Sequence, residues 1–124
     1  MDIICIRIGD KYGPEYEDYL NKKLFKYNII WIREPYHPEI KFQWNKMWGM
    51  QLDIDEPICV MDIDIILTND YEEVFNYPVK RGQFVAMPGW WRDRKNHSFI
   101  INGGFFKYHP KDCRYIYDKF MSDI

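Results

Sequence analysis

The sequence predicts an α/β fold, a three-layer sandwich on a mostly parallel, mixed sheet. Short apolar runs rich in β-branched residues alternate with segments of helical spacing, in the order β-α-β-α-β followed by β-β-α. Hydrophobic residues make up 47% of the chain and aromatic residues 19%, which argues against disorder. A chain of 124 residues can bury one core. We therefore expect residues 1–124 to form a single domain.

The first part of the chain predicts a strand, a loop, a helix and a second strand. The run Ile3–Ile8 is apolar and β-branched, and Gly9–Pro14 breaks it into a loop. A helix is expected from Pro14 to about Lys26, because proline and acidic residues favour a first helical turn. Tyr27–Ile32 is the second predicted strand.

The middle of the chain continues this alternation. Ile40–Leu52 carries apolar residues along one side, as a helix does. Pro57 introduces the apolar run Ile58–Met61, which predicts the central buried strand. Tyr71–Phe75 predicts a helical turn, and Gln83–Met87 predicts a fourth strand.

The end of the chain predicts two short strands and a helix. Ser98–Ile101 and Phe105–Tyr108 are strand-like, and the sequence Asn102-Gly103-Gly104 interrupts them. Pro110–Met121 has helical spacing. The whole pattern contains no repeat and no internal linker.

Two carboxylates follow the central strand. Asp62 and Asp64 stand two residues apart, so on a strand their side chains point the same way, with Cα atoms roughly 7 Å apart. Ligands of open α/β sheets bind at the carboxyl ends of strands, where these residues lie. Their mutual repulsion, about 3 kcal/mol at an effective dielectric constant of about 20, favours a cation between them. Hard carboxylate oxygens suit Mg²⁺ or Mn²⁺. The same residues also fit plain polar and apolar alternation on a half-solvated strand.

A similar triplet, Asp53-Ile54-Asp55, occurs earlier in the chain. It follows the helical segment and precedes Glu56-Pro57, which places it in a loop or at a helix end. Only the triplet at Asp62 follows an apolar strand, so we expect that triplet to form the site.

Composition argues against several partners and compartments. The net charge of −2 gives no general attraction to nucleic acid. No apolar run approaches the roughly 20 residues of a membrane span. The three cysteines lack metal-type spacing, and Cys5 and Cys59 fall in predicted buried strands, as is typical of a reducing compartment. We expect a cytoplasmic protein and leave a homo-oligomer open.

In this order, the segments resemble a metal-dependent glycosyltransferase of the GT-A fold. The matching pieces are the strand and loop Ile6–Tyr12, the D-x-D motif Asp62-Ile63-Asp64 and the later Asn102-Gly103-Gly104. Met61–Ile66 is similar to the D-x-D strand of glycogenin-like and galactosyltransferase-like enzymes. Short viral and bacterial glycosyltransferases open with a comparable loop. The resemblance implies a shortened GT-A domain that moves a sugar from a UDP-sugar, such as UDP-glucose, to an acceptor, in the host cytoplasm if the protein is viral.

The resemblance also assigns the nucleotide and metal sites. Tyr12 would stack on the base and Asp10 would make a polar contact, although both also fit a surface turn. Lys46 would meet the ribose or diphosphate, or else be a solvated helix residue. Asp62 and Asp64 would bind Mn²⁺ or Mg²⁺, which gives Asp64 its catalytic role. The nucleotide-binding set is Ile8, Gly9, Asp10, Tyr12, Lys46 and Asp62.

Sugar recognition is assigned to the second half of the chain. Asn102 would meet the donor sugar, with Gly103 and Gly104 letting the backbone approach it closely. An ordinary turn between strands is the alternative. Trp90 and Trp91 have flat faces suited to sugar rings, and they would equally well close the core.

The chain is shorter than most GT-A enzymes, whose further residues usually supply a third metal ligand and much of the acceptor site. Asp93 is our candidate catalytic base for an inverting mechanism. Two other functions stay open. The sequence Asp62–Thr68 is close to the first motif of haloacid dehalogenase-type phosphatases, with Asp62 as nucleophile and Asp64 as general acid, but that motif normally ends a first strand. A non-catalytic domain would bind the nucleotide sugar and need a partner chain for transfer.

Overall fold

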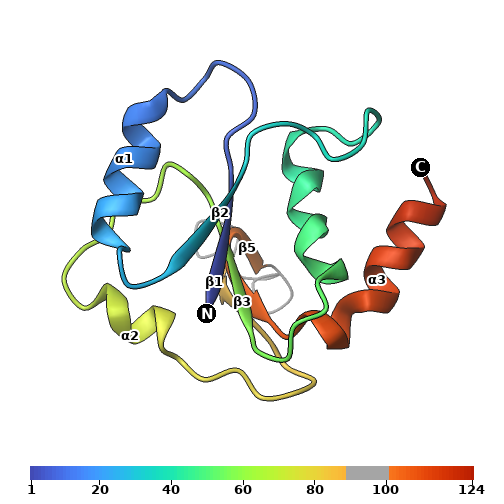
Figure 1. The fold of residues 1–124 in the computed structure, drawn as a ribbon. Helices are drawn as coiled ribbons and strands as arrows, with labels where there is room; N and C mark the ends of the chain where they lie inside the picture. The colour runs from blue at the N-terminus through green and yellow to red at the C-terminus, as the bar shows by residue number, and fades with distance from the viewer. Residues whose placement is uncertain (89–100) are drawn as a thin grey trace, which may run out of the picture.

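The computed structural model describes residues 1–88 and 101–124 (Figure 1). Strands and helical segments alternate along most of this length, as the sequence predicts. One of the helical segments, η1, is a 3₁₀ helix. The elements are β1 (Asp2–Ile6), α1 (Pro14–Lys23), β2 (Asn28–Ile32), η1 (Phe42–Gln51), β3 (Ile58–Met61), α2 (Tyr71–Phe75), β4 (Phe84–Pro88), β5 (Ile101–Tyr108) and α3 (Pro110–Ser122).

The strands form one mixed sheet in the order β2-β1-β3-β5-β4. Strand β1 pairs in parallel with β2 on one side and with β3 on the other. Strand β5 runs antiparallel to both of its neighbours, β3 and β4. The predicted α/β class and mixed sheet are therefore confirmed.

Helices cover both faces of the sheet. Figure 1 shows α1 and α2 on one side, with the green helix η1 and α3 on the other. Alternation along the strands supplies both contacts, since successive side chains of a strand point to opposite faces. In β1, Ile3 and Cys5 join the core under α1, whereas Ile4 joins the core under η1. The apolar runs are continuous because both faces of the sheet are buried.

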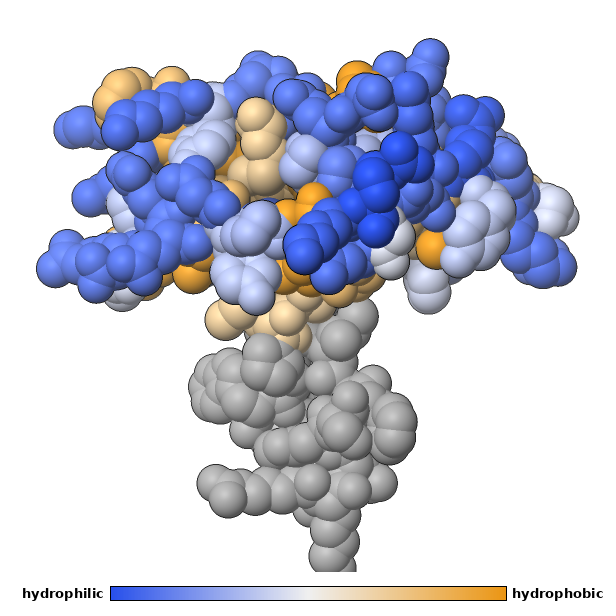
Figure 2. Space-filling model, turned by 90° about the horizontal axis from the view of Figure 1, so that it is seen from below, coloured by the Kyte–Doolittle hydropathy of each residue, from blue (hydrophilic) through white to orange (hydrophobic). Residues whose placement is uncertain are grey.

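The core contains all three cysteines, which are buried and free. Burial raises the pKa of the Cys5 thiol to about 12 and also raises the pKa of Cys59. The prediction that these two residues act as small core side chains is confirmed. Seen from below the view of Figure 1, polar side chains dominate the coloured surface, and apolar ones show as small areas between them (Figure 2).

Several predicted boundaries differ from the structure. The first strand ends at Ile6 and not at Ile8, and the chain then enters the loop that contains Gly9, whose φ is +87°. The first helix ends at Lys23. The predicted helix Ile40–Leu52 is the 3₁₀ helix η1, which begins only at Phe42.

The expected break at Asn102-Gly103-Gly104 is wrong. These residues belong to one strand, β5, which pairs with β3 throughout the register from Phe105 to Tyr108. The pairing with β4 shifts there instead, since Ala86 faces Phe106 but Met87 faces Asn102. Glycine in a strand often marks a bulge of this kind. The register of the β4–β5 pairing therefore shifts at these glycines, but strand β5 continues through them.

A buried lysine joins β5 to α2. Lys107 lies in the sheet at 1% exposure, and its Nζ donates to the carbonyl oxygens of Val74, Phe75 and Tyr77. The Val74 and Phe75 carbonyls lie in the last turn of α2 and that of Tyr77 lies just beyond it, where the helix dipole favours a cation. Desolvation lowers the pKa of this ammonium. Lys107 thereby fixes the short helix against the sheet.

A glycine allows η1 to lie close to the sheet. A β-carbon on Gly49 would stand 2.5 Å from Cδ1 of Ile4 and 2.7 Å from Cδ1 of Ile58. A methyl group at this position would therefore have to displace side chains of strands β1 and β3. The same helix carries Lys46 one turn earlier, so this packing also sets the height of Lys46 above the sheet.

We predict that Gly49→Ala destabilises the fold by about 1–3 kcal/mol, because the methyl group overpacks a filled core. Urea unfolding followed by tryptophan fluorescence measures this change. Gly103→Ala is the matched control, since nothing lies within 4 Å of a β-carbon built there. We expect the control to alter stability by no more than about 0.5 kcal/mol. Equal stabilities for both variants would contradict the packing of η1.

Candidate functional site

The two carboxylates of the D-x-D motif lie just beyond strand β3. The strand ends at Met61, and Asp64 sits in the turn that follows. The backbone N–H of Asp62 still donates to the carbonyl of Gly104, at 2.9 Å. The expectation that both carboxylates stand on the strand is therefore corrected. Both nevertheless line one cavity of about 400 Å³, which we call the carboxylate cavity.

Lys46 is the cation beside these carboxylates. Its Nζ lies 2.7 Å from Oδ1 of Asp62 and 2.7 Å from the carbonyl oxygen of Gly103. The Lys46 side chain is only 12% exposed, whereas that of Asp62 is 37% exposed. Charge-assisted bonds of this length are the strong ones. The structure thus joins η1, the turn after β3 and strand β5 through one ammonium group.

Tyr12 contacts the other carboxylate. Its hydroxyl donates to Oδ2 of Asp64 at 3.1 Å. The Tyr12 ring lines the carboxylate cavity and packs edge-on against Tyr16, with ring centroids 4.8 Å apart. Each carboxylate of the motif therefore has its own partner, an ammonium group for one and a phenol for the other.

The loop after β1 forms one wall of this cavity. Gly9 adopts a φ of +87°, a conformation in which L side chains are strained. The ring of Phe42, at the start of η1, lies 3.5 Å from a β-carbon built on Gly9. Ile8 and Tyr12 line the cavity, whereas Asp10 is exposed and is absent from its lining. Gly9 is likewise exposed and absent from the lining, so Gly9 and Asp10 both stand apart from the other predicted nucleotide-site residues.

A buried carboxylate holds this loop in place. Glu17 of α1 is 6% exposed and accepts hydrogen bonds from Arg33 at 2.6 and 3.1 Å and from Arg7 at 2.6 Å. Bonding to Arg33, more than bonding to Arg7, lowers the pKa of Glu17 and outweighs desolvation. Arg7 uses its Nε to donate to the carbonyl of Tyr12 at 3.1 Å. The cluster therefore links α1 and β2 to the backbone of Tyr12.

The residues predicted to hold the sugar divide into two groups. Gly103 and Gly104 lie beside Asp62, through the contacts of their carbonyls with Lys46 and with the Asp62 N–H. The backbone of Asn102 faces Met87 in the sheet. Trp90, Trp91 and Asp93 lie outside the described residues.

The sequence assigned no functional role to three further residues of the cavity lining. Phe42, Gln43 and Lys11 also face the carboxylate cavity. Lys11 directly precedes Tyr12, and its Nζ stands 5.4 Å from the centre of that ring. Phe42 and Gln43 begin η1 and precede Lys46 by four and three residues. This helical spacing is the one sequence signal that could have indicated a shared face.

The donor atoms fit a divalent cation bound together with a phosphate. Asp62 and Asp64 bring two carboxylates to one cavity. Within residues 1–88 and 101–124, no three His, Cys, Asp or Glu side chains gather as a metal group. Mg²⁺ typically uses one or two carboxylates and completes its shell with water and substrate phosphates. Two carboxylates therefore suit such a shared site better than a site closed by protein alone.

The other D-x-D triplet lies in a loop, as predicted. The carboxylates of Asp53 and Asp55 are 96% and 78% exposed. Both lie near Nζ of Lys111, at 3.9 and 3.8 Å. Pairs this exposed contribute little. The two triplets thus differ in their surroundings although their sequences match.

No helix among the described residues has the length and apolar character needed to cross a bilayer. Comparison of the chain with models of protein families, with curated proteins and with solved structures finds no match. The argument for function therefore rests on the site itself.

We predict that Glu17→Gln destabilises the protein by about 1.5–3 kcal/mol at neutral pH, the value of hydrogen bonds to charged groups. The pKa of Glu17 is lowered on folding. Its contribution is therefore complete above the unfolded value of about 4.3 and is lost as the pH falls through the lower folded value. Urea unfolding of wild type and variant across the acid range measures the difference.

The free energies of unfolding of wild type and Glu17→Gln should converge toward low pH, because a protonated Glu17 no longer carries the charge that the two arginines bind. Asp118→Asn is the control, because Asp118 forms an exposed pair with Arg114 on α3. That variant should remain within about 0.5 kcal/mol of wild type at every pH. A constant gap between Glu17→Gln and wild type down to the acid limit would contradict the charge-based account.

Proposed function

We propose that this chain is a metal-dependent glycosyltransferase of a minimal GT-A fold, acting on a UDP-sugar such as UDP-glucose. One observation carries the proposal: the first-loop Tyr12, the η1 residue Lys46 and both D-x-D carboxylates line a single cavity. These residues come from three separated parts of the sequence.

The cavity has the charges that a nucleoside diphosphate requires. Lys46 and Lys11 supply ammonium groups for the phosphates, and the rings of Tyr12 and Phe42 supply faces for a base. The carboxylates would repel a diphosphate if they acted alone. Mn²⁺ or Mg²⁺ held by Asp62 and Asp64 would reverse that repulsion and supply Lewis-acid stabilisation of the leaving diphosphate.

The proposed reaction is a group transfer between two oxygens. The bond from the anomeric carbon to the diphosphate oxygen breaks, and its electron pair stays on the diphosphate. An acceptor hydroxyl oxygen bonds to the anomeric carbon and loses its proton to a base. Lys46 would bind the developing negative charge on the diphosphate, and the Tyr12 hydroxyl would hold Asp64 in one orientation. Asp93 stays our candidate for the base of an inverting mechanism.

Two alternatives make different predictions. A non-catalytic domain would bind UDP-sugar in the same cavity but release no UDP without a partner chain. A phosphatase would release inorganic phosphate from a phosphate ester. In favour of transfer, the D-x-D motif follows the third strand along the chain and not the first. We place the protein in the cytoplasm, with a glycan, protein or small molecule as acceptor and with self-association open.

We predict that Asp64→Asn reduces Mn²⁺-dependent UDP-glucose binding by at least about tenfold, because the amide is a weaker ligand for a hard cation. Titration calorimetry with and without EDTA measures this. Asp53→Asn is the matched control, since it makes the same change in the exposed triplet. The control should bind as wild type does. Greater sensitivity at Asp53 than at Asp64 would contradict the assignment of the metal site to Asp62 and Asp64.

We also predict opposite effects on two ligands from Lys46→Met. Without nucleotide, the affinity for Mn²⁺ should rise by about 1 kcal/mol, because an ammonium group no longer competes for Asp62. Affinity for UDP should fall by about 1.5–3 kcal/mol, because a charged hydrogen bond to phosphate is lost. Calorimetric titrations of each ligand measure both effects.

Lys119→Met is the control for Lys46→Met, since Lys119 is an exposed lysine on α3. It changes the net charge equally and should leave both affinities as in wild type. Unchanged UDP affinity in Lys46→Met would remove Lys46 from the nucleotide site.

A further inference from the structure

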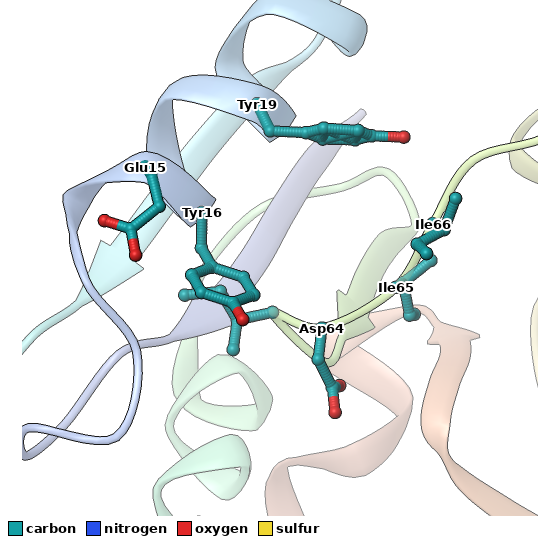
Figure 3. A pocket seen from close by; sticks show the side chains of 7 residues that line it. Glu15, Tyr16, Tyr19, Asp64, Ile65 and Ile66 are labelled. Atoms are coloured by element: carbon teal, nitrogen blue, oxygen red, sulfur yellow. The ribbon is translucent and has the colours of Figure 1, made fainter.

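A second cavity lies between α1 and the segment after β3. It has a volume of about 280 Å³, and we call it the tyrosine cavity (Figure 3). Tyr16 and Tyr19 enter it from α1, while Asp64 and Ile66 enter it from the opposite segment. In Figure 3 the Tyr16 ring lies toward Asp64, and the Tyr19 ring reaches across toward Ile66. Two aromatic rings and an aliphatic side chain thus line a small space that is open to solvent.

The two cavities meet at Asp64. This residue and Ile63 belong to the linings of both. On the side of the carboxylate cavity, Oδ2 of Asp64 accepts the Tyr12 hydroxyl bond. Tyr12 in turn touches Tyr16 edge to face. A ligand in the tyrosine cavity would therefore be separated from a ligand in the carboxylate cavity by the Asp64 carboxylate and this aromatic pair.

The lining indicates the charge of the ligand. Among the residues that the structure describes, its only ionisable groups besides the tyrosines are the carboxylates of Glu15 and Asp64, and none of these lining residues is a lysine, arginine or histidine. An anion such as a phosphate would be repelled. Carboxylates accept hydrogen bonds from hydroxyl groups, and exposed aromatic rings bury apolar faces. The lining therefore disfavours an anion and suits a molecule with hydroxyl groups at its edge and C–H groups on its faces.

The polar groups at the mouth have capacity for such a ligand. Within the described part of the chain, no hydrogen bond involves the Tyr16 hydroxyl or the Glu15 carboxylate. The Tyr19 hydroxyl, by contrast, accepts the N–H of Leu67 at 3.1 Å, which holds the segment after β3 to α1. Tyr19 forms a fixed wall, whereas Tyr16 and Glu15 can bond a ligand.

We propose that the tyrosine cavity binds one pyranose ring of a neutral carbohydrate and is the acceptor site of the proposed transferase. A pyranose has hydroxyls around its rim and C–H groups on its faces, which matches this lining. The acceptor role rests on the proposed function, because it takes the donor to lie in the carboxylate cavity. The shared wall at Asp64 places the two sugars next to each other.

The test uses methyl α-D-glucopyranoside and methyl β-D-galactopyranoside as probes, with saturation-transfer NMR as the readout of binding. Wild-type protein should bind at least one of them saturably. Tyr16→Ala should weaken that binding about three- to tenfold, the range expected for one aromatic contact. Tyr16→Phe should weaken binding less than Tyr16→Ala does, because the ring face remains and only the hydroxyl is lost. Glu15→Ala should weaken binding without altering any aromatic ring.

Tyr115→Ala is the matched control. Tyr115 lies on α3 and is 71% exposed, so the variant loses an exposed tyrosine far from α1. It should bind the glycosides as wild type does. An equal loss in Tyr115→Ala and Tyr16→Ala would overturn the proposal, because it would indicate non-specific contact with tyrosine.

Calorimetry with UDP and Mn²⁺ separates this inference from the proposed function. Glu15→Ala and Tyr16→Phe should bind UDP within about twofold of wild type, since neither residue lines the carboxylate cavity. If UDP binds but neither glycoside does, the tyrosine cavity is not a carbohydrate site and the proposed function survives. If the glycosides bind but UDP does not, the proposed function and the acceptor role both fall. Matching losses of UDP and glycoside binding in Glu15→Ala would overturn the separation of the two sites.

Discussion

The candidate site depends first on the ion pair between Lys46 and Asp62. The ammonium group is largely removed from water, which costs free energy that a single contact to an exposed carboxylate would not return. Two bonds of 2.7 Å, to Asp62 and to the carbonyl of Gly103, offset that cost. Breaking either bond would leave a buried charge half satisfied. The pair therefore fixes the relative positions of η1, the D-x-D turn and β5.

A second cluster acts on the opposite wall of the same cavity. Glu17 accepts hydrogen bonds from two guanidinium groups, and one of these, Arg7, also binds the carbonyl of Tyr12. The loop that contains Tyr12 makes no strand or helix of its own, so side-chain bonds such as these must hold it. Gly9 gives that loop its sharp change of direction. The loop that contains Tyr12 thus contacts the turn that contains Asp64 through the hydrogen bond between these two side chains.

The sequence predicted the strands well because their signal is local. A β-branched run followed by Asp62 marks both a buried strand and its end, and the exposed triplet at Asp53 could be set aside for the lack of such a run. Contacts between distant segments had no local signal. Asp64 lies far along the chain from Tyr12, and no periodicity relates them. The strand β5 was divided wrongly because glycine favours turns in general, whereas here pairing with β3 keeps the chain extended.

The tyrosine cavity shows a further limit of pattern reading. Tyr16 and Tyr19 have the spacing of a helix face, which predicts burial in a core. Tyr16 instead remains 37% exposed, because the segment after β3 passes α1 at a distance that leaves a cavity. Asp64 therefore lines both the tyrosine cavity and the carboxylate cavity. Because Tyr12 touches both Asp64 and Tyr16, any ligand that shifts this group in one cavity changes the free energy of binding in the other. Such coupling is reciprocal by thermodynamic linkage. In a domain of this size, one carboxylate and two tyrosines would then be sufficient to make donor and acceptor binding interdependent.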